Sequence, residues 1–102
     1  MAATAGVGTA QQESIDELRA RAEQGDADAQ TNLALMYANG TGVPQDDVQA
    51  YIWFSLSASR SSGEARDRAA NNRDRVYETL TFDQRAEGQR LAREWDEAHP
   101  RD

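Results

Sequence analysis

Apolar residues recur along this chain at intervals of three and four positions, the spacing of one face of an α-helix. Ile15, Leu18 and Ala22 follow this spacing and predict a helix from about residue 15 to residue 24. Gly25 suits the end of that helix, and Asp26 suits the start of a second one that runs to about residue 39.

The most apolar stretch of the chain begins after Asp46 and predicts a third helix that continues to about Arg60. Its apolar residues cover most of the helix circumference: Val48, Tyr51, Ile52, Trp53, Phe54 and Leu56. A helix that is apolar nearly all round is buried on more than one side. We therefore expect this helix at the centre of the domain.

Two further helices are predicted after an interruption at Ser61–Gly63. The first spans about residues 64–78, and the second follows a capping-box sequence from Thr81 to Gln84. Its apolar positions are Ala86, Leu91, Ala92 and Trp95. Because no segment alternates apolar and polar residues as a strand does, the sequence predicts a single all-α domain of about five helices.

The segment from Gly40 to Asp46 joins the second and third predicted helices through a short loop. Gly40 and Gly42 can adopt a positive φ without a steric penalty, and Pro44 disfavours helix at the residue before it. Asp46 can accept from the free amides of the next helix, with Gln49 as its capping-box partner. A helix, a tight loop and a second helix form the unit of an α-solenoid, which has to stack against neighbours to bury its apolar face.

Composition narrows the classes of function. The chain has 102 residues and no cysteine, so disulfides, cysteine-ligated zinc and cysteine nucleophiles are excluded. Its net charge of −7, from 18 acidic residues against 11 arginines and no lysine, disfavours a nucleic-acid partner. No apolar run is long enough to insert into a membrane.

The residues of the second and third helices and of their loop resemble the Sel1-like repeat (SLR) family, which is related to the tetratricopeptide repeat. The resemblance is carried by residues at fixed offsets: Ala29, Leu33, Tyr37, Gly40, Gly42, Val43, Asp46, Ala50, Trp53 and Phe54. It implies an α-solenoid-type fold. One complete unit is present, because residues 64–80 contain no second glycine-valine-aspartate loop.

This reading divides the chain into four parts. We expect a disordered segment over 1–13, a helical domain over 14–98 and a tail over 99–102. Within the domain, the best-matched repeat spans 25–63 and capping helices span 64–98.

The resemblance also implies a function without catalysis, in which the concave surface of stacked helices binds a peptide or a partner protein. The second helix would offer Asn32, Met36 and Asn39, because these side chains are not needed between the helices. Alternatives are a structural role as a self-associating or capping unit, including a homo-oligomer, and a small hydrolase of cell-wall or β-lactam chemistry. Relatives are often exported, which favours the periplasm or envelope over the cytoplasm.

The residue types give little indication of a catalytic function. His99, the single histidine, lies in the polar tail beside Pro100, where a frayed end is expected, and Asp46 and Asp47 are explained by helix capping. No histidine lies near the serines in sequence, so a serine catalytic triad is not expected. The sequence offers no other candidate for a catalytic, metal-binding or cofactor-binding site. The arginines between residues 64 and 78 could contact an acidic partner or phosphate, but they alternate with acids, which favours a solvated, ion-paired face.

Overall fold

A computed structural model describes residues 15–100 and shows an all-α fold, as the sequence predicts. Residues 15–23 are helical, and four helices follow: α2 (Ala27–Asn39), α3 (Asp47–Ser59), α4 (Gly63–Thr79) and α5 (Phe82–Ala98). The described part of the chain contains no strand. The segment 1–13, predicted to be disordered, lies outside the described residues, as do residues 101 and 102 of the predicted tail.

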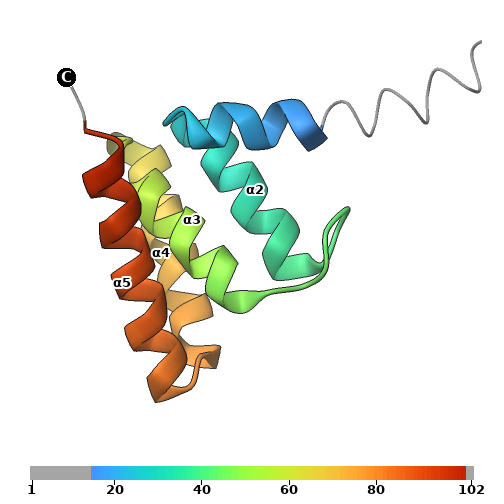
Figure 1. The fold of residues 1–102 in the computed structure, drawn as a ribbon, viewed down its shortest axis with the longest axis vertical. Coiled ribbons are helices and arrows are strands. Elements are labelled where there is room, and N and C mark those ends of the chain that lie inside the picture. Colours follow the sequence, from blue (N-terminus) through green and yellow to red (C-terminus); the bar gives the residue numbers. More distant parts are fainter. Residues whose placement is uncertain (1–14, 101–102) are drawn as a thin grey trace, which may run out of the picture.

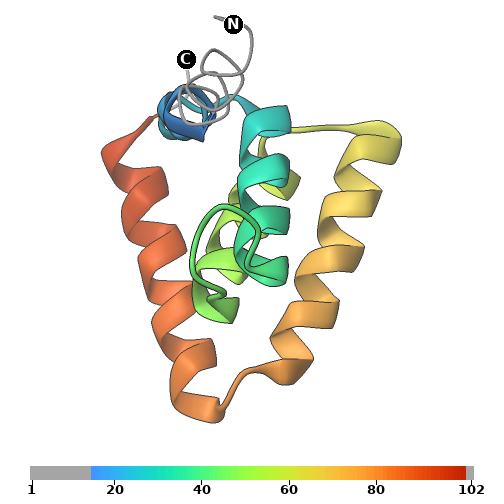
Figure 2. The ribbon, with the colours of Figure 1, turned by 90° about the vertical axis from the view of Figure 1, so that its right-hand side faces the viewer.

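Helix α3 is the centre of the fold, as its apolar circumference predicts. It packs against α2, α4 and α5, which surround it in Figures 1 and 2. Eight of its thirteen residues are buried: Ala50, Tyr51, Ile52, Trp53, Phe54, Leu56, Ser57 and Ala58. The burial of a helix on several sides explains why its sequence lacks a polar face.

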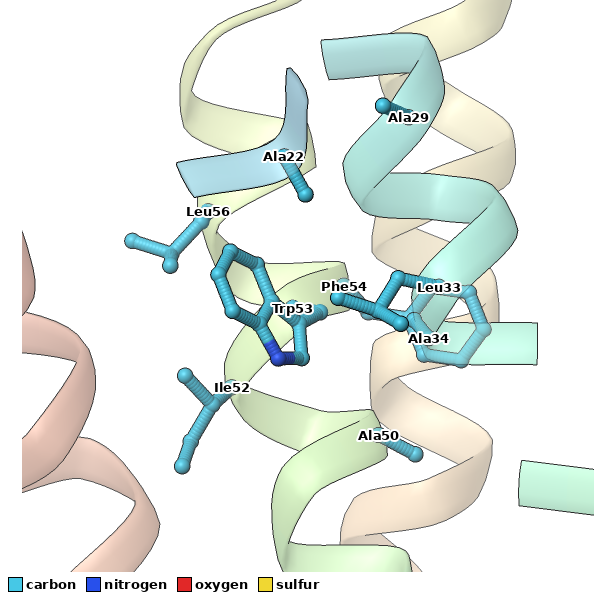
Figure 3. Close-up of a cluster of buried hydrophobic side chains, with 9 residues drawn as sticks. All are labelled: Ala22, Ala29, Leu33, Ala34, Ala50, Ile52, Trp53, Phe54 and Leu56. Atoms are coloured by element: carbon cyan, nitrogen blue, oxygen red, sulfur yellow. The ribbon is translucent and has the colours of Figure 1, made fainter. Parts of the chain in front are cut away.

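The core gathers side chains from residues 15–23, α2 and α3 (Figure 3). Leu33 and Phe54 are fully buried there, and Trp53 meets Trp95 of α5 edge to face, with ring centroids 5.9 Å apart. The segment 15–23 is also joined to α2 by a hydrogen bond from Arg19 Nη1 to the Tyr37 hydroxyl (3.0 Å), which raises the pKa of Arg19.

The loop between α2 and α3 has the backbone that its glycines favour. Gly40 ends α2 with φ 70°, and Gly42 has φ 77°. Asp46 begins α3, and its side chain accepts from the Gln49 amide at 3.1 Å. The backbone amide of Asp46 donates to the Tyr37 carbonyl (2.9 Å) instead of to the Gln49 side chain, so the predicted capping box is only half formed. This bond fixes the start of α3 against the end of α2.

Helices α4 and α5 diverge from the turn that joins them (Figure 2). The turn holds the predicted capping box, in which the side chains of Thr81 and Gln84 bond each other's backbone amides. Leu80 is buried beside it. At the other end of α5, the His99 ring stacks on Trp95 at 3.8 Å between centroids, so the frayed end expected at this histidine is not seen.

Arg60, at the end of α3, ties α5 to the centre of the fold. Its Nη2 donates to Asp96 Oδ1 (3.1 Å) and to the His99 carbonyl (2.8 Å), and its guanidinium lies 4.8 Å from the centroid of the Trp95 ring.

No described helix combines the length and apolar character needed to cross a bilayer.

Candidate interaction groove

A groove of about 180 Å³ lies between α2 and α4, with α3 as its floor. We call it the α2/α4 groove. Helix α2 supplies Leu35, Ala38 and Asn39, helix α3 supplies Phe54, and helix α4 supplies Asn72, Arg75 and Val76. The lining therefore combines apolar side chains with two amides and one guanidinium.

Hydrogen bonds hold the helices of the groove in place. Ser57 of α3 donates to the Ala27 carbonyl of α2 (3.0 Å) and also bonds Thr31, which fixes the first turns of α2. Thr79 at the end of α4 donates to Asp47 Oδ2 at the start of α3 (3.0 Å). These bonds join α2 and α4 separately to α3, which forms the floor of the groove.

The helix–loop–helix that forms one wall and the floor of the groove is recognised by a family model. Residues 27–62, from the start of α2 to the residue before α4, match the Sel1 repeat. The chain contains a Sel1 repeat. No curated protein and no solved structure gives a significant match to the chain.

Sel1 repeats are generally protein-interaction modules and typically are not catalytic. In this chain the first helix of the Sel1 repeat, α2, and the helix that follows the repeat, α4, face the α2/α4 groove. The groove therefore lies beside the first helix of the repeat, where the sequence places the interaction surface.

The three residues predicted to contact a partner occupy different surroundings. Asn39 lines the groove. Asn32 is exposed on α2 outside the lining, seven residues and thus about two turns before Asn39 on the same side. Met36 is half-buried, and its Cε lies within 3.0 Å of where a Cβ on Gly42 would be, so it packs toward the loop.

Other lining residues were not among the predicted contacts. Leu35 is 39% exposed, although the sequence includes it in an apolar run. Its position three residues after Asn32 and four before Asn39 is the signal that could have assigned it to the same face. The sequence does not single out Asn72, and it favours a solvated, ion-paired face for Arg75, because the rotation of α4 relative to α2 depends on tertiary packing.

Candidate catalytic groups are not brought together at the groove. His99 Nδ1 lies 2.8 Å from the Trp95 carbonyl at the end of α5. Asp46 caps α3, and Asp47 accepts from Gln45 and Thr79. Within residues 15–100 no three histidine or acidic side chains are placed to hold a metal ion. The lining of the groove offers apolar side chains, two amides and one guanidinium.

Proposed function

We propose that the chain is an adaptor that binds an extended segment of a partner protein in the α2/α4 groove. The observation that carries this proposal is the lining itself, in which exposed Leu35 and Arg75 flank Asn39 and Asn72 on facing helices. This arrangement places polar groups on both sides of an apolar floor. It suits a peptide that lies along the groove.

Each kind of lining residue has a distinct part in this binding. An asparagine amide both donates and accepts, so Asn39 and Asn72 can bond the free backbone groups of an extended peptide. Leu35, Phe54 and Val76 offer apolar area to one of its side chains. Asn32 lies on the same side of α2 as Asn39 and adds a second amide there. Met36 packs toward the loop between α2 and α3.

The guanidinium of Arg75 adds a preference for an acidic group. No carboxylate of residues 15–100 lies within ion-pair distance of it. A guanidinium forms strong, directed hydrogen bonds with a carboxylate. We therefore propose that the bound segment combines an apolar side chain with a nearby acidic one.

Peptides selected from a random display library against the folded protein test this proposal. We expect Asn39→Ala and Asn72→Ala each to weaken the selected peptides by about three- to tenfold, the value of a hydrogen bond or two. Asn71→Ala is the matched control, because Asn71 is an exposed asparagine on α4 outside the lining. Equal losses in all three variants, or no loss in any, would contradict the proposal.

A structural role as a self-associating or capping unit is the second candidate. It is favoured by Leu35 and Phe82, large apolar side chains that are exposed on the described surface and that self-association would bury. Sedimentation velocity over a range of concentrations tests it, since a strict monomer removes this candidate. The division into a repeat over 25–63 and capping helices over 64–98 remains a prediction.

A further inference from the structure

A second recess lies between α4 and α5, on the side of α3 away from α2. It consists of two hollows of about 280 and 240 Å³ that share Ser55, and we call it the α4/α5 trough. Helix α3 supplies its floor, with Tyr51 and Ser55 among the lining residues. The walls carry Arg66, Ala70 and Arg73 from α4 and Gln89, Ala92, Arg93 and Asp96 from α5.

The trough is a locally positive surface on an acidic chain. Three of its lining residues are arginines, and its one carboxylate, Asp96, already accepts from Arg60 at 3.1 Å. No carboxylate of residues 15–100 lies within ion-pair distance of Arg66 or Arg93, while Arg73 pairs with Asp74 at 3.0 Å. Because the whole chain has a net charge of −7, a surface with unpaired arginines indicates a site that attracts a negatively charged ligand.

The register of α4 explains how a helix with balanced charge presents a basic face. Arg66, Ala70 and Arg73 are spaced by four and three residues and share the side that faces the trough. The acids Glu64, Asp67 and Glu78 fall on other sides and are absent from the lining. The ion-paired face expected from the sequence holds for Arg68 with Glu64 (3.8 Å) but not for Arg66.

The floor of the trough contains a polar group without a partner. The Ser55 hydroxyl is buried and makes no hydrogen bond with any described residue, although Ser57, two positions further along α3, bonds α2. This oxygen has almost no accessible surface, so a ligand in either hollow cannot reach it. The chemistry that the trough offers a ligand is therefore that of its arginines.

We infer that the α4/α5 trough binds a short acidic segment of a partner protein, with its carboxylates directed at the exposed guanidinium groups of Arg66 and Arg93. Helices of 17 residues are about 25 Å long, so the trough holds a short segment only. A nucleic acid would extend beyond it toward the exposed Glu64, Asp67 and Glu94, which repel phosphates. The site lies across α3 from the α2/α4 groove and is independent of the function proposed there.

The test uses a fluorescein-labelled peptide of alternating glutamate and alanine and measures its affinity by fluorescence anisotropy. We expect binding at low ionic strength that weakens with added salt. Arg93→Glu should weaken it about tenfold or more, because the change removes a charged hydrogen bond and adds a negative charge that repels the peptide. Arg66→Glu should act similarly. Arg90→Glu and Arg68→Glu are controls for net charge, because they make the same charge change on the same helices outside the trough lining. Each also breaks an ion pair within its own helix, with Glu94 and Glu64 respectively.

The outcomes separate this site from the other readings of the surface. Absence of binding, or equal losses in the trough and control variants, overturns the inference. Tighter binding of a single-stranded DNA oligonucleotide with the same variant dependence assigns the trough to phosphate instead, and self-association abolished by Arg93→Glu assigns it to a second copy. Asn39→Ala and Asn72→Ala should leave the acidic peptide bound, so failure of the groove and failure of the trough are distinguishable.

Discussion

The α2–α3 pair and the α4–α5 pair differ in how their two helices meet. Between α2 and α3 the contact is close, because small buried residues such as Ala34 and Ala50 let the helices approach and Ser57 bonds across to α2. Helices α4 and α5 instead diverge, and each buries one residue, Ala69 and Gly88 respectively.

This difference assigns different tasks to the two pairs. The Sel1 repeat supplies most of the buried core, so substitutions of its buried side chains should act mainly on stability. Helix α4 stands apart from both α2 and α5, and a recess lies on each side of it. Helices α4 and α5 thus bury few of their own residues and present more of their side chains along the recesses.

The largest expected effect is the loss of a core side chain from the repeat. Phe54 is 1% exposed, so Phe54→Ala should lower the free energy of unfolding by about 3–5 kcal/mol through lost burial and an unfilled cavity. Phe82→Ala in α5 is the matched control, because Phe82 is 84% exposed and should cost less than about 0.5 kcal/mol. Urea denaturation measures both, and similar losses would contradict the contrast between the pairs.

An intermediate effect is expected in the loop of the repeat. A Cβ on Gly42 would lie 3.0 Å from atoms of both Ile15 and Met36, and its φ is 77°. Gly42→Ala should therefore cost about 2 kcal/mol or more, of which about 1–2 kcal/mol is left-handed backbone strain.

Gly63→Ala, at the first residue of α4, separates the two contributions to that cost. Gly63 also has a positive φ, 61°, but a Cβ there would meet nothing within 4 Å. It should show the strain alone and cost less than Gly42→Ala in thermal or urea unfolding. A larger loss at Gly63 would show that the contact with residues 15–23 contributes nothing.

A smaller effect is expected where α5 is tied to α3. Arg60 has a side chain 12% exposed and contacts Asp96, His99 and Trp95, so Arg60→Ala should cost about 1–3 kcal/mol. In this variant the rate of amide hydrogen exchange should increase more in the last turns of α5 than in α2. Arg90→Ala, which removes an exposed pair with Glu94 in the same helix, should cost about 0.5 kcal/mol or less.

The helix boundaries were predictable from sequence because they depend on local chemistry. Asp26, Asp46 and Thr81 each accept from an amide three residues ahead, and Gly40 has the positive φ that ends α2. A capping residue and its target lie within one turn, so the sequence alone specifies their contact. The central position of α3 was equally readable, because it follows from composition.

The surfaces were less predictable because they depend on how each helix is rotated in the fold. The spacing of polar residues on α2 predicts Asn39 as a contact residue. Asn72 and Arg75 line the groove only because of how α4 packs beside α2 in the fold. The basic side of α4 was hidden by its balanced charge. The position of Arg60 depends on contacts 36 and 39 residues away in sequence, and no local pattern encodes them.

The most direct test of the proposed binding function is the solution NMR structure of the protein with the tightest peptide selected by display. We expect intermolecular NOEs from the peptide to the methyl groups of Leu35 and Val76 and to the side-chain amides of Asn39 and Asn72. NOEs confined to the α4/α5 trough or to Phe82, with the α2/α4 groove unperturbed, would contradict it.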